Sequence, residues 1–230
     1  MTKDGTNVAA DPSGPAPDWP PVELLAGQQN RVDVLAWLPG RYELQTAGGK
    51  AAVIEAKGIP EAIPVTGPWE LSFPPDWGAP QRVTLERLMS WSDHNDTGVK
   101  YFSGMATYRK TISVPAAMLG KDRRLCLDLG NVQVMAQVKL NGKDLGILWK
   151  PPFRVDITSA VKAGENTLEV VVANVWANRL IGDRLLPPAK RYTRTSGQVK
   201  LANNAPLAES GLLGPVRIVT AQNVDVVFNK

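Results

Sequence analysis

The sequence predicts an all-β protein, an antiparallel β-sandwich, from three observations. Between Ser103 and Asn174 the chain consists of short runs in which every second residue is apolar, as in half-buried strands whose side chains alternate between two faces. Turn signals separate these runs, and Asn141-Gly142 has the residue types that a two-residue type I′ hairpin requires. No helical pattern of ten residues with caps at both ends is present, so repeated βαβ units and a complete TIM barrel are excluded.

The predicted strands follow one another along the chain. An early group lies at 32–38, 42–44 and 51–56. The main domain begins at Ile63, where Trp69, Leu71 and Phe73 share one face. Three alternating sets then predict core strands: Leu125, Leu127 and Leu129; Val134, Ala136, Val138 and Leu140; and Leu168, Val170 and Val172. Strand signals return from Ser210 to Thr220 and again near Val224.

Two segments depart from this pattern. Pro74–Pro80 is rich in proline and turn residues and cannot lie within a central strand. From Val175 to Glu209 the chain has few strand signals, and loops of this length in a compact domain are usually functional or packed on a partner. The best short helix candidate is 115–119.

These patterns predict three regions. Residues 1–22 are rich in proline and poor in apolar groups, so we expect a disordered leader. Residues 23–62 form a short β element that is marginal alone and either docks on the next domain or is the tail of a preceding module. Residues 63–230 form the sandwich.

Composition excludes several function classes. The 230 residues carry a net charge of +4 that is spread along the chain, and no aromatic platform is interleaved with a basic cluster. We therefore expect no nucleic-acid binding. No apolar run approaches the length that spans a bilayer, and no apolar core follows Lys3 and Asp4, so neither a membrane span nor a signal peptide is predicted.

Cysteine and histidine each occur once. Cys126 cannot form an internal disulfide and is expected to pack as a small apolar residue. With His94 as the only histidine, a zinc site with several His and Cys ligands is excluded. So is any Ser-His-Asp arrangement that does not use His94. We expect His94 to hydrogen-bond its own surface loop, with a role as acid or base as the alternative.

Several motifs together resemble the sugar-binding β-sandwich of glycoside hydrolase family 2, a galactose-binding-like jelly roll. The motifs lie at 101–110, at Ala136-x-Val-x-Leu-Asn-Gly-x-x-x-Gly, at 156–158, at 162–168 and at Ser210-Gly-Leu-Leu-Gly-Pro-Val-Arg. The amino-acid sequences of 67–73, 90–94, 98–104 and 174–183 are similar, more closely still, to the carboxy-terminal part of large bacterial α-L-rhamnosidases of family 106. The resemblance covers roughly 63–220.

The resemblance implies an accessory role beside a catalytic barrel. In those enzymes the catalytic carboxylates belong to a barrel domain, which this chain lacks. The resemblance therefore implies either an accessory fragment or a free-standing relative that kept this module. It further implies a rhamnose-containing glycan or glycoside as ligand, the barrel as partner, and a parent protein that is periplasmic or secreted in a bacterium.

The candidate sugar site lies directly after the last core strand. Amide, guanidinium and carboxylate groups are suitable partners for sugar hydroxyls, and an indole face can lie against the C–H side of a pyranose. In family 2 relatives the equivalent loop lines the active-site pocket of the barrel. The alternative is that Trp176 plugs the edge of the sandwich and Arg179 pairs with Asp183. The candidates for substrate binding are Asn174, Trp176, Asn178, Arg179, Asp183 and Trp149.

Loop carboxylates provide weaker candidates. Glycoside cleavage needs two carboxyl groups across the scissile bond, and Asp93, Asp183 and Glu209 are the candidates for a catalytic role. Asp93 and Asp96, with Asn95 between them, offer the oxygen ligands that calcium prefers. Three functions follow: a non-catalytic carbohydrate-binding module, a small hydrolase that uses these carboxylates, or a structural domain that docks a barrel and binds no sugar.

Overall fold

The computed structural model describes residues 2–3, 6–7, 20–26, 32–194, 205–224 and 226. Most of the expected disordered leader, 1–22, lies outside the described residues, but its described parts include the short strands Thr2–Lys3 and Thr6–Asn7 and the first residue of the strand Val22–Ala26. By contacts the chain divides into two compact units: 1–63 with 115–126 and 218–230, and 64–114 with 127–217. The sequence-based division instead placed 115–126 and 218–230 in the sandwich.

The first unit consists of antiparallel strands around a strand that is buried on both faces. Val34 and Ala36 of β4 (Val32–Ala36) belong to one apolar cluster, with Tyr42 and Ile54. The alternate residues Leu35 and Trp37 belong to another, which includes Cys126. Its elements are β1 (Thr2–Lys3), β2 (Thr6–Asn7), β3 (Val22–Ala26), β4, β5 (Gly40–Gln45), β6 (Ala51–Ala56) and the 3-10 helix Ala116–Met118. Three further strands cross the boundary between the two units along the chain: β7 (Ile63–Pro64), β11 (Arg123–Asp128) and β18 (Arg217–Val224).

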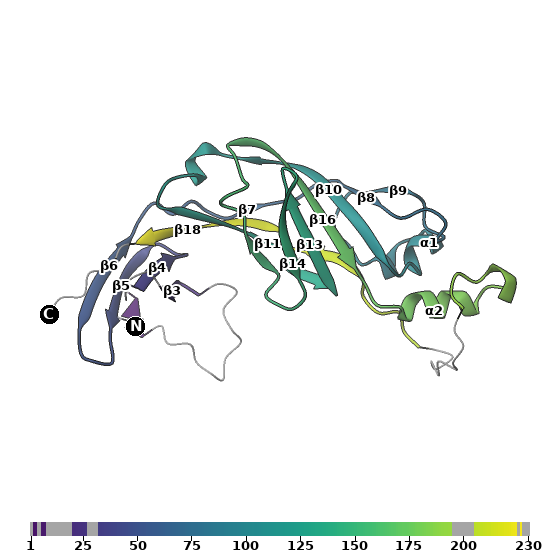
Figure 1. Cartoon of the computed structure of the whole chain (residues 1–230), viewed down its shortest axis with the longest axis horizontal. Coiled ribbons are helices and arrows are strands. Elements are labelled where there is room, and N and C mark those ends of the chain that lie inside the picture. The colour runs from purple at the N-terminus through teal and green to yellow at the C-terminus, as the bar shows by residue number, and fades with distance from the viewer. Residues whose placement is uncertain are drawn as a thin grey trace. The chain divides into compact units, whose positions relative to one another are not determined.

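The second unit is built on a six-stranded antiparallel sheet in the order β14-β13-β16-β10-β8-β9 (Figure 1). The hairpin between β13 and β14 turns at Asn141 and Gly142, whose φ angles of 52° and 80° are those of the predicted type I′ turn. The strands are β8 (Trp69–Ser72), β9 (Arg82–Leu85), β10 (Met105–Val114), β12 (Asn131–Gln133), β13 (Met135–Leu140), β14 (Lys143–Leu148), β15 (Arg154–Asp156), β16 (Gly164–Ala173) and β17 (Gly211–Gly214).

Alternation along these strands produces the core, as the sequence predicts. Leu168, Val170 and Val172 of β16 are fully buried, and their partners on β10 and β13 include Tyr108 and Val138. The antiparallel pair β12–β17 forms a separate two-stranded sheet that contacts β16. On the outward face, Met105 of β10 and Met135 of β13 are both register partners of Ala173. The all-β, antiparallel, galactose-binding-like sandwich is thus confirmed.

A compact aromatic and polar cluster ties β10 to the loop before α1 (Thr97–Lys100) and to β17. The hydroxyl of Tyr108 accepts hydrogen bonds from the indole N–H of Trp91 at 2.6 Å and from the backbone N–H of Leu212 at 3.0 Å. Burial raises the pKa of the Tyr108 phenol well above its usual range. Trp91 also packs edge-on against Phe73 and Phe102.

The sequence did not predict α2 (Ala177–Arg184), which begins soon after β16 (Figure 1). An amphipathic helix is recognised by an apolar stripe, but α2 buries Asn178, Arg179, Gly182 and Asp183. Its N-cap, Trp176, makes no side-chain capping bond, so the usual start signal is missing as well. Two 3-10 helices, Trp91–Asp93 and Pro188–Lys190, complete the unit's described elements. In the described part of the chain, no helix is both long enough and apolar enough for a bilayer span.

Tyr108→Phe is expected to lower the free energy of unfolding by about 2–3 kcal/mol, because two buried donors lose their acceptor. Tyr101→Phe is the control, since the Tyr101 hydroxyl makes no hydrogen bond within the described residues. Urea denaturation of both variants measures the difference. Equal stabilities would show that the hydroxyl of Tyr108 does not hold the cluster together.

Candidate functional site

The candidate site is centred on the junction between the end of β16 and the start of β10. The side-chain oxygen of Asn174 accepts a hydrogen bond from the backbone N–H of Gly104 at 2.9 Å, and its amide group donates to the carbonyl of Phe102 at 2.9 Å. The backbone N–H of Asn174 donates in turn to the carbonyl of Gly104 at 3.3 Å. Asn174 therefore fixes the segment 102–104 through its side chain and backbone.

Ser103 joins this segment to the start of α2. Its hydroxyl donates to the carbonyl of Val175 at 2.9 Å and accepts from the backbone N–H of Arg179 at 3.1 Å. The second bond satisfies a donor in the first turn of the helix, where N–H groups have no partner within the helix. A side chain distant in sequence thus replaces the missing cap of α2.

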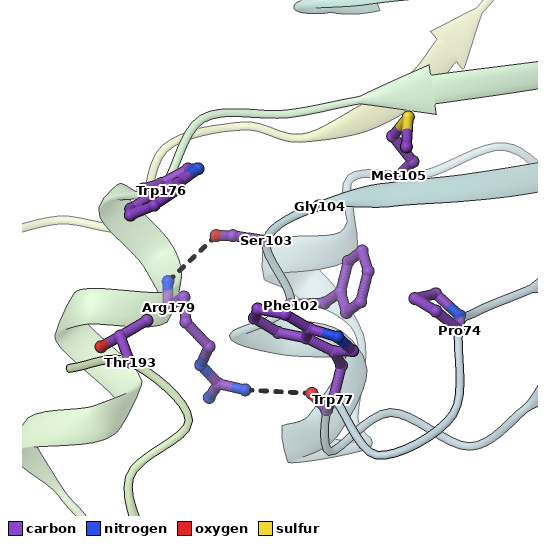
Figure 2. A pocket seen from close by; sticks show the side chains of 9 residues that line it. All are labelled: Pro74, Trp77, Phe102, Ser103, Gly104, Met105, Trp176, Arg179 and Thr193. Atoms are coloured by element: carbon purple, nitrogen blue, oxygen red, sulfur yellow. Dashed lines mark hydrogen bonds between the residues drawn. The ribbon is translucent and has the colours of Figure 1, made fainter.

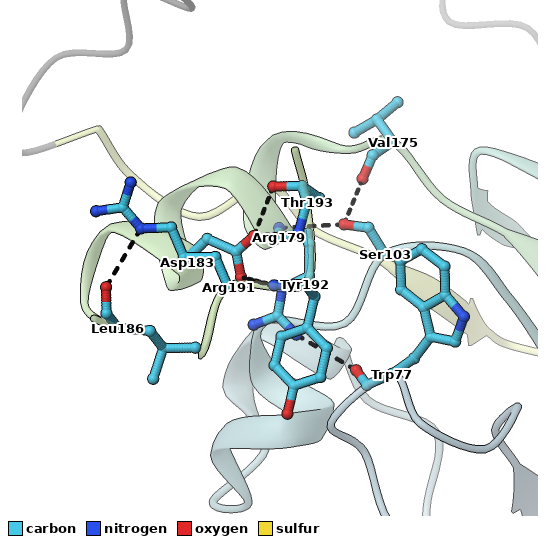
Figure 3. A network of polar contacts seen from close by, with 9 residues as sticks. All are labelled: Trp77, Ser103, Val175, Arg179, Asp183, Leu186, Arg191, Tyr192 and Thr193. Carbon is cyan, nitrogen blue, oxygen red and sulfur yellow. Dashed lines mark hydrogen bonds and ion pairs between the residues drawn. The ribbon is translucent and has the colours of Figure 1, made fainter. Parts of the chain in front are cut away.

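Asp183 connects α2 to the segment that follows it (Figure 3). Its carboxylate accepts hydrogen bonds from the backbone N–H groups of Tyr192 at 3.3 Å and Thr193 at 2.8 Å, and from the Thr193 hydroxyl at 2.5 Å. It also forms an ion pair with Arg179, with Nε and Oδ1 3.4 Å apart. Asp183 is 3% exposed, so these partners surround it.

Arg179 is held from several sides. Its Nη1 donates to the carbonyl of Trp77 at 3.4 Å, and its guanidinium lies 4.7 Å from the centroid of the Tyr192 ring. Burial lowers the pKa of Arg179, while the negative charge of Asp183 opposes this effect. The ion pair expected as the structural alternative, Arg179 with Asp183, is present.

Asn178 holds the chain segment that leads into β17. Its amide group donates to the carbonyl of Ala208 at 2.7 Å, and its side-chain oxygen accepts from the N–H of Ala208 at 2.8 Å. Asn178 has no exposed surface. All four polar residues proposed from the sequence, Asn174, Asn178, Arg179 and Asp183, therefore bond to this chain's own backbone.

A pocket of about 410 Å³ opens beside this junction (Figure 2). Trp176 borders it from the start of α2, and Trp77 and Pro74 reach it from the loop after β8. Trp176 is 67% exposed, so it does not plug the edge of the sandwich. The remaining lining residues are Phe102, Ser103, Gly104, Met105, Arg179 and Thr193.

The other candidates lie outside this lining. Trp149 follows β14 and is as exposed as Trp176, at 66%. Asp93, the last residue of the 3-10 helix Trp91–Asp93, and Glu209 have exposed carboxylates, and neither they nor Asp183 line the pocket. The structure therefore brings Asn174, Trp176, Asn178, Arg179 and Asp183 together and leaves Trp149, Asp93 and Glu209 apart from the pocket.

The loop proposed for calcium is organised by its own hydrogen bonds. The Asp96 carboxylate accepts from the N–H of Val99 at 3.1 Å and caps α1. The His94 ring nitrogen Nδ1 accepts from the N–H of Asp96 at 3.0 Å, so His94 does bond its own loop. Among the described residues, no three His, Cys, Asp or Glu side chains are grouped as a metal site. Calcium binding by Asp93 and Asp96 stays a prediction from the sequence.

Sequence reasoning did not include several residues of the pocket in the site. Trp77 lies in the proline-rich segment 74–80, and Phe102 and Met105 lie in the motif at 101–110, so none of them was among the candidates for the site. The available signal was weak: an aromatic residue in a proline-rich turn, far in sequence from α2. Only the fold shows that the 74–77 loop and α2 border one pocket.

Comparison with known proteins supports a relation to glycoside hydrolases. Residues 90–199 match a family model described as "Glycosyl hydrolase 2 galactose-binding domain-like". A protein of Formosa agariphila named "Putative beta-glucuronidase" is 41% identical over 204 residues, which cover 78% of this chain and 17% of that protein.

Solved structures give the same result for the fold. The rhamnosidase from Novosphingobium sp. PP1Y has a TM-score of 0.66 and 29% identity, and the match covers 88% of this chain and 25% of that one. An uncultured Clostridium sp. beta-glucuronidase has a TM-score of 0.51 and 19% identity, with 79% and 31% covered. The chain spans 17% and 25% of the lengths of the first relative and the first structure, respectively. Residues 90–199 are therefore similar to the galactose-binding-like sandwich of glycoside hydrolase family 2.

Asp183→Asn is expected to lower the free energy of unfolding by about 2–4 kcal/mol, because it leaves Arg179 buried without its counter-ion and weakens the bonds to 192–193. Asp93→Asn, at an exposed site, is the matched control and should change it by less than about 0.5 kcal/mol. Chemical denaturation checks both. An unchanged stability in Asp183→Asn would mean that the carboxylate is not a structural anchor.

Gly182→Ala tests the packing of α2. Alanine favours a helix over glycine by about 1 kcal/mol, but a Cβ at 182 would lie 2.6 Å from the Cβ of Tyr101, which cannot rotate away. We expect a net loss of about 1–3 kcal/mol in thermal or chemical unfolding. In the control Gly48→Ala, the added methyl meets only the Thr46 hydroxyl at 3.9 Å. A stabilised Gly182→Ala variant would contradict this packing.

Proposed function

We propose that the second unit is a non-catalytic carbohydrate-recognition module of a glycoside hydrolase of the α-L-rhamnosidase type. The proposal draws on the rhamnosidase of Novosphingobium sp. PP1Y, with 29% identity over 88% of this chain, and on the motifs at 67–73 and 174–183. The observation that carries it is the exposed indole of Trp176 at the rim of a preformed pocket. An indole face held in this way can bury the C–H side of a pyranose.

The polar candidates then have two different roles. Trp176 contacts the saccharide, while Arg179 borders the pocket with its charge balanced by Asp183. Asn174, Asn178 and Asp183 position the rim, because their hydrogen-bonding groups are directed to 102–104, 208 and 192–193. A preformed rim avoids the entropy cost of ordering these segments when ligand binds.

A structural role in docking a catalytic barrel is the second candidate. The observation that favours it is a set of exposed apolar side chains around α2, including Val175 at 45%, Trp176 at 67% and Leu185 at 68%. Exposed apolar side chains gathered at one place commonly mark protein contacts. A free-standing hydrolase is less well supported, because Asp183 is buried and already bonded and Asp93 and Glu209 lie outside the pocket lining.

Titration with methyl α-L-rhamnoside tests the proposal. We expect binding without hydrolysis, and Trp176→Ala should weaken it about tenfold, because one stacked indole is lost. Trp149→Ala removes an equally exposed indole away from the pocket lining and should leave the affinity unchanged. Isothermal titration calorimetry measures the binding.

Two results would overturn the proposal. Release of nitrophenol from 4-nitrophenyl α-L-rhamnoside by the purified chain, lost in Glu209→Gln, would support the hydrolase. Binding that is absent, or equally reduced by both tryptophan substitutions, would remove Trp176 from recognition and favour docking.

A further inference from the structure

The pocket below Trp176 has apolar walls and few polar atoms left to offer a ligand. Pro74, Trp77, Phe102, Met105 and Trp176 provide its apolar lining, and they come from the loop after β8, the start of β10 and the start of α2 (Figure 2). Trp77 and Met105 are 42% and 65% exposed, so both reach the surface. Such a pocket favours a flat apolar group over a polyhydroxylated ring.

Most of the polar atoms in the walls are already used within the protein. The Ser103 hydroxyl bonds to Val175 and Arg179, and the backbone groups of Gly104 bond to Asn174. The carbonyl of Trp77 accepts from Arg179, and the Thr193 hydroxyl donates to Asp183. A sugar hydroxyl that entered the pocket would therefore lose its bonds to water without an equivalent replacement from these atoms.

The charge at the pocket is balanced as well. Arg179 is the cation in the lining, and its Nε lies 3.4 Å from the carboxylate of Asp183. A paired and largely buried guanidinium offers little net attraction to an acidic sugar. The geometry therefore disfavours the carboxylate of a uronic acid as the buried part of a ligand.

Volume and rigidity complete the argument. An apolar cavity of about 150 Å³ holds a benzene molecule, so a pocket of about 410 Å³ has room for a substituted or bicyclic aromatic ring. The bonds of Ser103, Asn174 and Asp183 fix the surrounding backbone before any ligand arrives. An aromatic ring placed between indole, phenyl and thioether groups gains stacking and S–aromatic contacts.

We propose that this pocket binds the aryl aglycone of an aryl glycoside, while the sugar ring stays at the rim against Trp176. The placement of the sugar rests on the function proposed above, whereas the aryl site does not. Within the described residues the indole N–H of Trp176 has no hydrogen-bond partner, and it is available to a sugar oxygen at the rim. The module thereby selects glycosides by their non-sugar part.

The test compares three probes on the intact chain: 4-nitrophenyl α-L-rhamnoside, methyl α-L-rhamnoside and 4-methylumbelliferone. The aryl rhamnoside should bind at least tenfold more tightly than the methyl rhamnoside. In saturation-transfer NMR its aromatic protons should receive more saturation than its sugar protons. 4-Methylumbelliferone should bind alone and compete with the aryl rhamnoside.

Two variants have matched controls. Trp77→Ala should weaken aryl binding about tenfold, with Trp149→Ala as the unchanged control. Met105→Lys places a charge in the pocket wall and should reduce aryl binding at least tenfold. Its control is Met135→Lys, on the opposite side of Ala173, at a residue outside the pocket lining. All four positions are exposed, and unfolding curves confirm that the variants fold.

The outcomes separate this inference from the proposed function. Equal affinity for methyl and aryl rhamnosides, unaffected by Trp77→Ala, would overturn the aryl site and leave sugar recognition standing. Binding of 4-methylumbelliferone that Trp77→Ala weakens, without any binding of methyl rhamnoside, would support the aryl site and overturn sugar recognition. Binding of none of the probes would overturn both.

Discussion

The pairing of β10 with β16, continued past the ends of both strands by Asn174 and Ser103, is the constraint on which the site depends. The ladder of β10 and β16 ends where Met105 lies opposite Ala173, and Gly104 and Asn174 are the first residues beyond it. Their backbone groups would then be unpaired, but the Asn174 side chain bonds to both Phe102 and Gly104. Because buried backbone groups must be paired, this amide determines how the chain leaves the sheet.

The helix that follows is held by polar contacts rather than by an apolar face. Asn178, Arg179 and Asp183 are directed inward, and each reaches a segment distant from the helix or later in the chain. A short helix has little stability of its own, so tertiary contacts of this kind determine whether it forms. The same contacts leave Trp176, at the beginning of the helix, free on the surface.

This arrangement separates the residues that build the site from those that meet a ligand. The polar side chains that the sequence suggested for sugar binding form hydrogen bonds within the protein, and the surface left for a ligand is aromatic and aliphatic. Recognition proposed for such a surface depends on shape and stacking, with few directional bonds. The exposed apolar groups near α2 extend the same character to the surrounding surface.

Local patterns in the chain were enough to predict the strands of the sheets. Alternation at Leu168, Val170 and Val172 predicts a strand with one buried face, and Asn141-Gly142 predicts a type I′ turn, because both signals depend on neighbours within a few residues. The pair of Arg179 and Asp183, which the sequence offered only as the structural alternative to sugar binding, is present, whereas Trp176, expected in that alternative to plug the sandwich edge, is exposed.

The helix α2 and the pocket depend on contacts between segments that are distant in the sequence. The stripe that α2 buries is polar, so its periodicity carries no hydrophobic signal, and its first turn is satisfied by Ser103, which lies far away in the sequence. Trp77 and Trp176 border one pocket only because the loop after β8 and the end of β16 both lie beside the start of β10, at the same end of the strands. Contacts between distant segments leave no periodic pattern in the chain, and a sequence without its fold does not reveal them.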